Sequence, residues 1–195
     1  MPGSSLWLIP PGNYPLNQKL TSLIEQTASA FGSTDLFIPH VTLTSDLVSP
    51  SSYGSEPQEW LDSLVLPAAD DVHVIFEKLD SEDVYFRKLY IKCKKTAGLK
   101  ALATVCRKQV VGHEEEATAR KWAEETYSPH VSLLYHDCKR VDTVGLEGMS
   151  KLVQDQGIDL AAGGGEGSSW TGGRVVLVPT YKSTSEWKSI AQRML

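Results

Sequence analysis

Two short stretches of this sequence repeat the same arrangement of chemically useful residues. The first is Pro39-His40-Val41-Thr42-Leu43 and the second is Pro129-His130-Val131-Ser132-Leu133, with the two histidines ninety positions apart in a chain of 195 residues. Histidine can exchange a proton near neutral pH, because its unperturbed pKa is about 6.5. A hydroxyl two residues further on can donate a hydrogen bond to an anion. Two such pairs facing each other across a cleft would suit a phosphate group.

Each stretch is expected to be a β-strand. Successive side chains of a strand point to opposite faces, so His40 and Thr42 share one face while Val41 and Leu43 share the other. The proline suits the first position of a strand, where its missing N–H breaks no ladder hydrogen bond. The valine and leucine would then enter a core, and the histidine and hydroxyl would face the opposite copy.

The rest of the chain predicts strands and helices that could hold these two strands. Strands are expected at residues 6–9, 37–44, 72–76, 84–93, 128–136 and 174–178, and helices at 16–31, 56–64, 96–111 and 141–154. The acidic turn at 80–83 favours an antiparallel hairpin between two of these strands. Residues 185–195 fit a helix or a last strand equally well. The pattern indicates an α+β fold of antiparallel sheets with helices on their outer faces.

Two segments carry no regular pattern. Residues 113–125 are strongly charged, and the run Glu114-Glu115-Glu116 within them is expected to be a solvated face. Residues 163–167 are four glycines and a glutamate and predict a flexible loop, whose spacing does not match a dinucleotide-binding fingerprint. His73, His113 and His136 have no matched partner elsewhere in the chain and are expected at the surface.

Composition limits the classes of partner. A chain with 41% apolar residues can bury a core of its own, and we expect one bilobed domain over residues 1–195. A formal net charge of -5 argues against a broad basic surface for nucleic acid, so small substrates are favoured over a stable nucleic-acid complex. Cys93, Cys106 and Cys138 form neither a CxxC pair nor a disulfide framework, which indicates a reducing compartment.

The sequence shows no recognisable targeting signal and no membrane-spanning stretch. Its N-terminus lacks the basic region of a signal peptide, and no stretch approaches the roughly 18 apolar residues that cross a bilayer. A monomer in the cytoplasm is the expectation, with association with an internal membrane compartment left open.

The paired motifs resemble those of the two-histidine (2H) phosphoesterase superfamily. Within it, the sequence is most similar to the fungal and plant 2′,3′-cyclic-nucleotide 3′-phosphodiesterases: Leu6-Trp7-Leu8-Ile9-Pro10 is similar to their opening strand, and His130-Val131-Ser132-Leu133-Leu134-Tyr135 to their second motif. The likeness covers essentially the whole chain. It implies two pseudo-symmetric lobes, each an antiparallel sheet with helices outside, and an active site in the central cleft. It also favours a strand within residues 185–195.

The resemblance implies a reaction and a set of residues. Such enzymes open a 2′,3′-cyclic phosphate at the P–O3′ bond to leave a 2′-phosphate, and in this family ADP-ribose 1″,2″-cyclic phosphate, a by-product of tRNA splicing, is a further substrate. His40 and His130 would be the catalytic acid and base, without a metal or other cofactor. Thr42 and Ser132 would bind the non-bridging oxygens. Trp7 and Tyr135 would line the cleft, where an aromatic face can stack on a nucleobase.

Two alternatives remain at this stage. The chain could be an RNA end-processing relative that acts on 2′–5′ linkages, which predicts a more basic cleft. It could also be a binding module that holds a nucleotide or an RNA end without turnover. Both motifs are intact, which favours the enzyme. The two histidines cannot be divided into acid and base from sequence, because their contexts are nearly identical.

Overall fold

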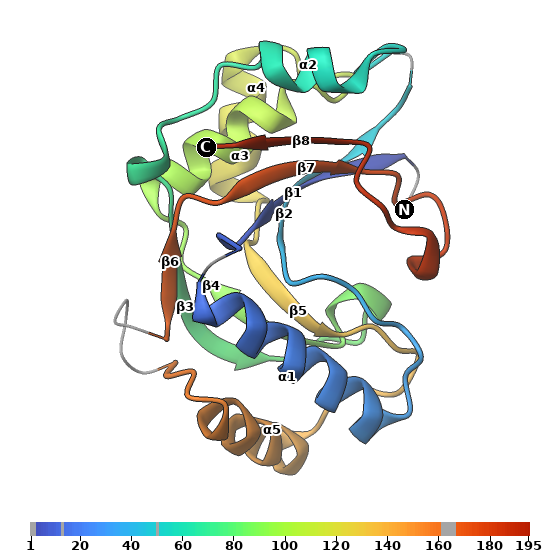
Figure 1. The fold of residues 1–195 in the computed structure, drawn as a ribbon, viewed down its shortest axis with the longest axis vertical. Coiled ribbons are helices and arrows are strands. Elements are labelled where there is room, and N and C mark those ends of the chain that lie inside the picture. Colours follow the sequence, from blue (N-terminus) through green and yellow to red (C-terminus); the bar gives the residue numbers. More distant parts are fainter. Residues whose placement is uncertain (1–2, 13, 50, 161–166) are drawn as a thin grey trace.

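A single curled sheet of eight antiparallel strands forms the centre of the molecule (Figure 1). The computed structural model describes residues 3–12, 14–49, 51–160 and 167–195. The strand order across the sheet is β6-β3-β4-β5-β2-β1-β7-β8. The strands are β1 (Ser4–Ile9), β2 (Val41–Leu47), β3 (His73–Asp80), β4 (Leu89–Cys93), β5 (His130–Leu134), β6 (Ser169–Thr171), β7 (Arg174–Val178) and β8 (Ala191–Met194).

The sheet has two four-stranded halves that meet at the histidine strands. Strands β2 and β5 are neighbours, and their pairing consists of Val41 opposite Val131. These are the valines that follow the two histidines. Continuing this antiparallel register by one residue sets His40 beside Ser132 and Thr42 beside His130. The expected two sheets are therefore joined into one, and the joint is the repeated motif itself.

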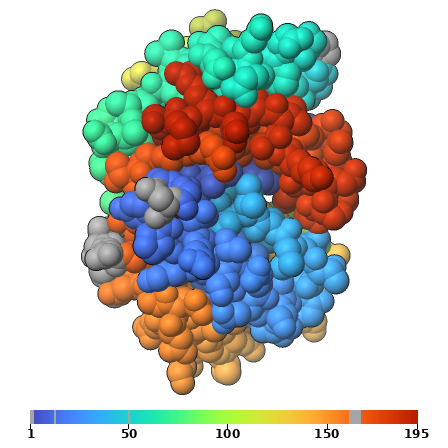
Figure 2. Space-filling model, viewed as in Figure 1, coloured from blue at the N-terminus to red at the C-terminus, as the bar shows by residue number. Residues whose placement is uncertain are grey.

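Helices cover the outer faces of the two halves. Helix α1 (Pro15–Phe31) packs on β5 beside α5 (Thr143–Asp155), so these two cover the half that contains β3, β4 and β6. Helices α3 (Ala97–Arg107) and α4 (Glu116–Glu125) pack together on the β2 side, and α2 (Pro57–Ser63) packs on β8. Figure 2 shows the same division, with α1 in blue adjoining α5 in orange and the C-terminal segment in red belonging to the other half.

Local sequence explains most of these elements. Helix α1 buries Leu16, Leu20, Leu23 and Ile24 on one side and ends at Gly32, which adopts the left-handed conformation with φ of 69°. Thr96 caps α3 by accepting a hydrogen bond from the backbone N–H of Leu99. The predicted α+β fold, the hairpin of β3 and β4 and the last strand, β8, are confirmed.

One expected strand boundary differs from the structure, one helix was not expected, and one expected loop cannot be compared. Residues 85–87 form a 3-10 helix, not the start of the next strand, because the Arg87 N–H binds the Val84 carbonyl and the strand begins only at Leu89. The charged segment contains α4, whose Ala119 and Ala123 are buried. Its short apolar stripe was hidden among charges. The expected glycine-rich loop at 163–167 lies, except for Gly167, outside the described residues.

One carboxylate connects three loops near the cleft. Asp35, between α1 and β2, accepts hydrogen bonds from the hydroxyls of Tyr85 and Thr184. Tyr85 belongs to the 3-10 helix before β4, and Thr184 begins another 3-10 helix, Thr184–Glu186, before β8. The loops that border the histidine strands are thus fixed to one another. Within the described ranges, no helix combines the length and apolar character needed to cross a membrane.

Candidate active site

The two motif histidines are held in the same way. The Nδ1 atom of His40 lies 2.7 Å from the carbonyl oxygen of Ile38, and the Nδ1 atom of His130 lies 2.7 Å from that of Ser128. A carbonyl can only accept, so each Nδ1 carries a proton and each neutral imidazole keeps its lone pair on Nε2. Both side chains line one cavity of about 390 Å³. The structure therefore brings together the two imidazoles that the sequence paired.

Burial keeps His40 uncharged. Its side chain is 4% exposed, and the imidazole stacks face to face on the indole of Trp7, with ring centroids 3.7 Å apart. Burial lowers the pKa of His40 to about 4, while its contact with the Ile38 carbonyl acts in the opposite direction and the nearby His130 lowers it further. At neutral pH this neutral ring is therefore a proton acceptor.

His130 has a more polar surrounding. Its pKa is also lowered, mainly by burial, and the Ser128 carbonyl opposes this shift; Arg87 lowers the pKa and Glu82 raises it. Arg87 and Glu82 form an ion pair at 2.6 Å, and Glu82 also accepts a hydrogen bond from the hydroxyl of Tyr90 at 2.8 Å. The Tyr90 ring meets His130 edge to face at 5.2 Å. A charge network thus adjoins this histidine.

The two motif hydroxyls are placed differently. Both Thr42 and Ser132 line the cavity. Ser132 donates a hydrogen bond of 3.0 Å to the carbonyl oxygen of Phe86, so its hydroxyl must turn before it can donate to a bound phosphate. The pseudo-symmetry of the motifs therefore does not extend to the hydrogen bonds of their hydroxyls.

The two aromatic residues that were expected to line the cleft also differ in their position relative to the cavity. Tyr135 lines the cavity, and its hydroxyl lies 3.5 Å from the Nε2 atom of His40. Burial raises the pKa of Tyr135, so its hydroxyl stays protonated. Trp7 does not line this cavity: it is 1% exposed and lies behind His40. His40 covers one face of the Trp7 indole in this structure, and stacking of Trp7 on a nucleobase stays a prediction.

Strand β2, which begins directly after His40, is bulged where it passes the cavity. Trp7 pairs with Thr42 and Leu6 pairs with Thr44, so Leu43 is an extra residue in β2, and a second extra residue precedes Leu47. Asp46, in this second irregular stretch, has a positive φ of 67°. Bulges strengthen the twist of a strand and redirect its side chains. As a result residues 42–46 all contribute to the cavity lining.

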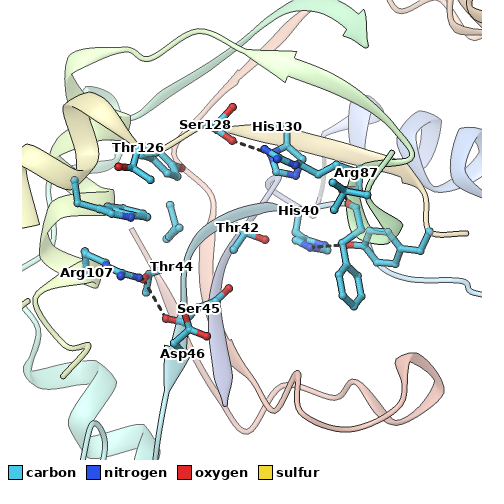
Figure 3. Close-up of a pocket in the computed structure, with 17 residues that line it drawn as sticks. His40, Thr42, Thr44, Ser45, Asp46, Arg87, Arg107, Thr126, Ser128 and His130 are labelled. Atoms are coloured by element: carbon cyan, nitrogen blue, oxygen red, sulfur yellow. Dashed lines mark hydrogen bonds between the residues drawn. The ribbon is translucent and has the colours of Figure 1, made fainter. Parts of the chain in front are cut away.

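Two arginines of the cavity were not identified from sequence. Neither Arg87 nor Arg107 was predicted as a site residue. Both line the cavity with the histidines, and Figure 3 shows Arg107 beside Thr44, with Thr42 between this pair and His40. Neither has a local signal, since Arg107 is the last residue of an amphipathic helix and looks like an ordinary exposed end.

The other three histidines do not line the cavity that His40 and His130 share. His73 is exposed, as expected. His113 was expected at the surface but is half-buried, and its Nε2 atom lies 2.8 Å from an Nη atom of Arg107. His136 is also half-buried, and its Nδ1 atom accepts a hydrogen bond from the backbone N–H of Cys138. Across the described part of the chain, no three His, Cys, Asp or Glu side chains are grouped as metal ligands.

Comparison with known proteins agrees with this geometry. A family model described as cyclic phosphodiesterase-like protein matches residues 1–195. A protein of Phaeosphaeria nodorum named 2′,3′-cyclic-nucleotide 3′-phosphodiesterase is 56% identical over 195 residues, and a protein of Neurospora crassa with the same name is 42% identical over 214 residues; both alignments cover 100% of each chain.

A solved structure supports the fold. The crystal structure of LigT from E. coli, complexed with 3′-AMP, matches with a TM-score of 0.54 over 100% of this chain and 99% of that chain, at 13% sequence identity. The resemblance drawn from the two histidine motifs is thereby confirmed at the level of family and fold. This chain belongs to the cyclic phosphodiesterase family of the two-histidine phosphoesterases.

Proposed function

We propose that this chain hydrolyses 2′,3′-cyclic nucleotides to nucleoside 2′-phosphates, with His40 and His130 as the catalytic pair. One observation carries the assignment of the residues: in a member of this family, two imidazoles with identical Nδ1 contacts leave Nε2 available at the same cavity. The names of the full-length relatives support the substrate class. A cavity of about 390 Å³ is within the usual range for small-molecule sites.

The reaction needs one proton removed and one supplied. The neutral imidazole takes a proton from water through Nε2 as the water oxygen attacks phosphorus, and the protonated imidazole gives a proton to O3′ as the P–O3′ bond breaks. The product keeps its phosphate on O2′. After turnover the pair again holds one proton, now on the other ring, and exchange with water restores the starting form. The structure accommodates either histidine as the base.

Charge in the cavity favours the form with one proton. Burial lowers the pKa values of both histidines because it disfavours imidazolium. Before substrate binds, both imidazoles are therefore largely neutral at pH 7. An anionic cyclic phosphate between the rings raises both pKa values and allows one ring to be protonated. The Thr42 hydroxyl, and the Ser132 hydroxyl once it turns from Phe86, then donate to the oxygens on which negative charge increases.

The wider setting of the reaction is also a proposal. ADP-ribose 1″,2″-cyclic phosphate is a candidate second substrate, converted to the 1″-phosphate in the metabolism of tRNA splicing. Action as a cytoplasmic monomer without a metal or other cofactor is our proposal as well. The free thiols of Cys93, Cys106 and Cys138 fit a reducing compartment.

The test is a product analysis. Purified protein is incubated with adenosine 2′,3′-cyclic phosphate in the presence of EDTA, and the product is identified by chromatography, with His40→Ala and His130→Ala alongside. The expected product is adenosine 2′-phosphate, with each variant slower by roughly 10²- to 10⁴-fold. The 3′-phosphate would contradict the proposed regiochemistry, and a requirement for metal would contradict the mechanism. Nucleotide binding without turnover would indicate a binding module.

A further inference from the structure

The cavity continues beyond the two histidines to Arg107. This arginine is the last residue of α3, and it contributes to the same cavity as His40 and His130. Along β2 the cavity lining runs from His40 through Thr42 to Thr44, and an Nη atom of Arg107 lies 3.4 Å from the Thr44 hydroxyl (Figure 3). The proposed mechanism gives this end of the cavity no role.

The guanidinium of Arg107 is fixed in position by neighbouring residues. It lies over the ring of Trp122, with the guanidinium carbon 4.6 Å from the ring centroid. Its other Nη atom donates to the Nε2 atom of His113 at 2.8 Å. Arginine has five N–H donors, and its Nε is buried with no hydrogen-bond partner among the described residues. Contacts with uncharged groups therefore orient the Arg107 guanidinium, and some of its N–H donors have no hydrogen-bond partner among the described residues.

The charge of Arg107 is not paired. Among the described residues, no carboxylate oxygen lies within 4.0 Å of its guanidinium nitrogens. Arg87, the other arginine of the cavity, is by contrast paired with Glu82 at 2.6 Å. Burial lowers the pKa of Arg107, which reflects the cost of holding a partly dehydrated cation there. An anion bound beside it would offset that cost.

The spacing fits a second phosphate of the substrate. Thr42 and Thr44 flank the bulged residue Leu43, and two residues of chain span at most about 7 Å. A cyclic phosphate held at His40, His130 and Thr42 closes the O2′ and O3′ positions of a ribose, whose C5′ carbon projects from the far side of the ring. A phosphate on O5′ would then lie one sugar away from the reacting phosphorus, towards Thr44 and Arg107.

We propose that Arg107 binds a phosphate group carried on O5′ of the ribose, and that the enzyme therefore prefers 5′-phosphorylated cyclic nucleotides over cyclic nucleosides. This inference rests on the proposed function. Guanidinium is well suited to the task, since its N–H groups match the oxygens of phosphate. The same chemistry is offered by a free 5′-phosphate and by the internucleotide phosphate of an RNA end, and we assign the free 5′-phosphate because the chain is acidic overall.

Two other groups at this end of the cavity bear on the proposal. Asp46 lines the cavity and its charge favours the charged form of Arg107, but its side chain is exposed and its repulsion of an anion is screened by water and salt. His113 has a lowered pKa, caused first by burial and then by Arg107, so it remains a neutral acceptor. Of the two arginines that line the cavity, Arg107 is the one without a carboxylate within 4.0 Å among the described residues.

Three substrates test the inference in the unmodified enzyme. They are adenosine 2′,3′-cyclic phosphate, the same nucleotide with a 5′-phosphate, and the dinucleotide ApA with a terminal 2′,3′-cyclic phosphate. We expect kcat/KM to be at least tenfold higher for the 5′-phosphorylated mononucleotide than for the unphosphorylated one, and the preference to fall as salt is added. An equal preference for the dinucleotide would assign the site to RNA ends and overturn our choice of ligand.

Matched variants locate the effect. Arg107→Gln should reduce the preference to near one, and Arg107→Lys should retain part of it. Arg120→Gln removes the same charge from an exposed position on α4 that does not line the cavity, so the preference should persist. An unchanged preference in Arg107→Gln, or no preference in the unmodified enzyme, would refute the inference. Failure of the proposed function is a different result, because none of the three substrates would then be turned over.

Discussion

The indole of Trp7 and the imidazole of His40 lie face to face, with centroids 3.7 Å apart and planes inclined by 12°. Trp7 pairs with Thr42 across β1 and β2, so the strand pairing that places the indole also places the hydroxyl of the first motif. Trp7 therefore supports the His40 ring from behind. It helps to exclude water from one face of His40 and to keep its pKa low.

The role of Trp7 can be separated from its contribution to the core. Trp7→Phe should raise the pKa of His40 towards 6.5 and lower kcat by roughly ten- to a hundredfold, since small errors of position are costly in catalysis. The loss should be the same for adenine and cytosine substrates. NMR titration of His40 and steady-state kinetics measure both effects.

Trp170→Phe is the matched control for that experiment. Trp170 is also 1% exposed, but it packs against Phe76 in the half-sheet of β3 and β6. Both variants should lose about 0.5–3 kcal/mol of unfolding free energy. Only Trp7→Phe should change the titration of His40. A KM effect of Trp7→Phe that depended on the base would restore the role of Trp7 as a stacking platform.

Stability should depend on pH through His40. Its pKa is lowered to about 4 in the folded chain and is near 6.5 when unfolded, so between these values the unfolded chain binds more protons. The contribution of His40 to the free energy of unfolding should thus fall as pH is lowered from 6.5 to 4, by up to about 3 kcal/mol, and stay constant below 4. Urea titrations across this range give the slope, which should be smaller in His40→Gln; equal slopes would contradict the buried neutral imidazole.

The pH dependence of catalysis follows from the pair as a whole. The profile of kcat/KM reports the free enzyme, whose two imidazoles both have lowered pKa values, so its optimum should lie on the acidic side of 6.5. The profile of kcat reports the complex, where the bound anion favours imidazolium, and should be displaced to higher pH. Coincident profiles would show that the substrate phosphate does not lie between the rings.

Arg87 should affect only one member of the pair. Its charge lowers the pKa of His130, and it does not contribute to the shift of His40. Arg87→Met should raise the pKa of His130 in the free enzyme and leave that of His40 in place, as followed by NMR. Arg120→Met, at an exposed position on α4 and paired with Glu116, is a control of equal charge. A shift of both histidines would point to a general effect of net charge.

Removal of the Ser132 hydroxyl and removal of the Thr42 hydroxyl should have different effects on stability and on turnover. Ser132 donates to the Phe86 carbonyl, so Ser132→Ala should lower stability by about 1 kcal/mol in addition to slowing turnover. Thr42→Val should act mainly on kcat, by up to roughly 10²- to 10³-fold if its hydroxyl stabilises the transition state. Thermal melts and kinetics of both variants decide this. Equal loss of stability would mean that Thr42 also has a structural bond.

Much of the fold could be predicted because its signals are local. The buried stripe of α1 and its terminal Gly32 specify a helix whatever packs on it, and the alternation in His40-Val41-Thr42-Leu43 specifies a strand with one polar face. The repetition of that strand was sufficient to pair two histidines ninety residues apart. Helix α4 was missed because two small alanines bury its inner face, a pattern that charged neighbours conceal.

The sequence by itself determined the chemistry available: two imidazoles and two hydroxyls on the polar faces of matched strands. Tertiary structure alone decided what surrounds them. Trp7 lies behind His40 because β1 pairs with β2. The Ser132 hydroxyl is hydrogen-bonded because a 3-10 helix brings the Phe86 carbonyl close to it. Arg107 enters the cavity because α3 packs on β2. These contacts join residues far apart in the chain, and no local pattern encodes them, because propensity and periodicity describe only neighbours in sequence.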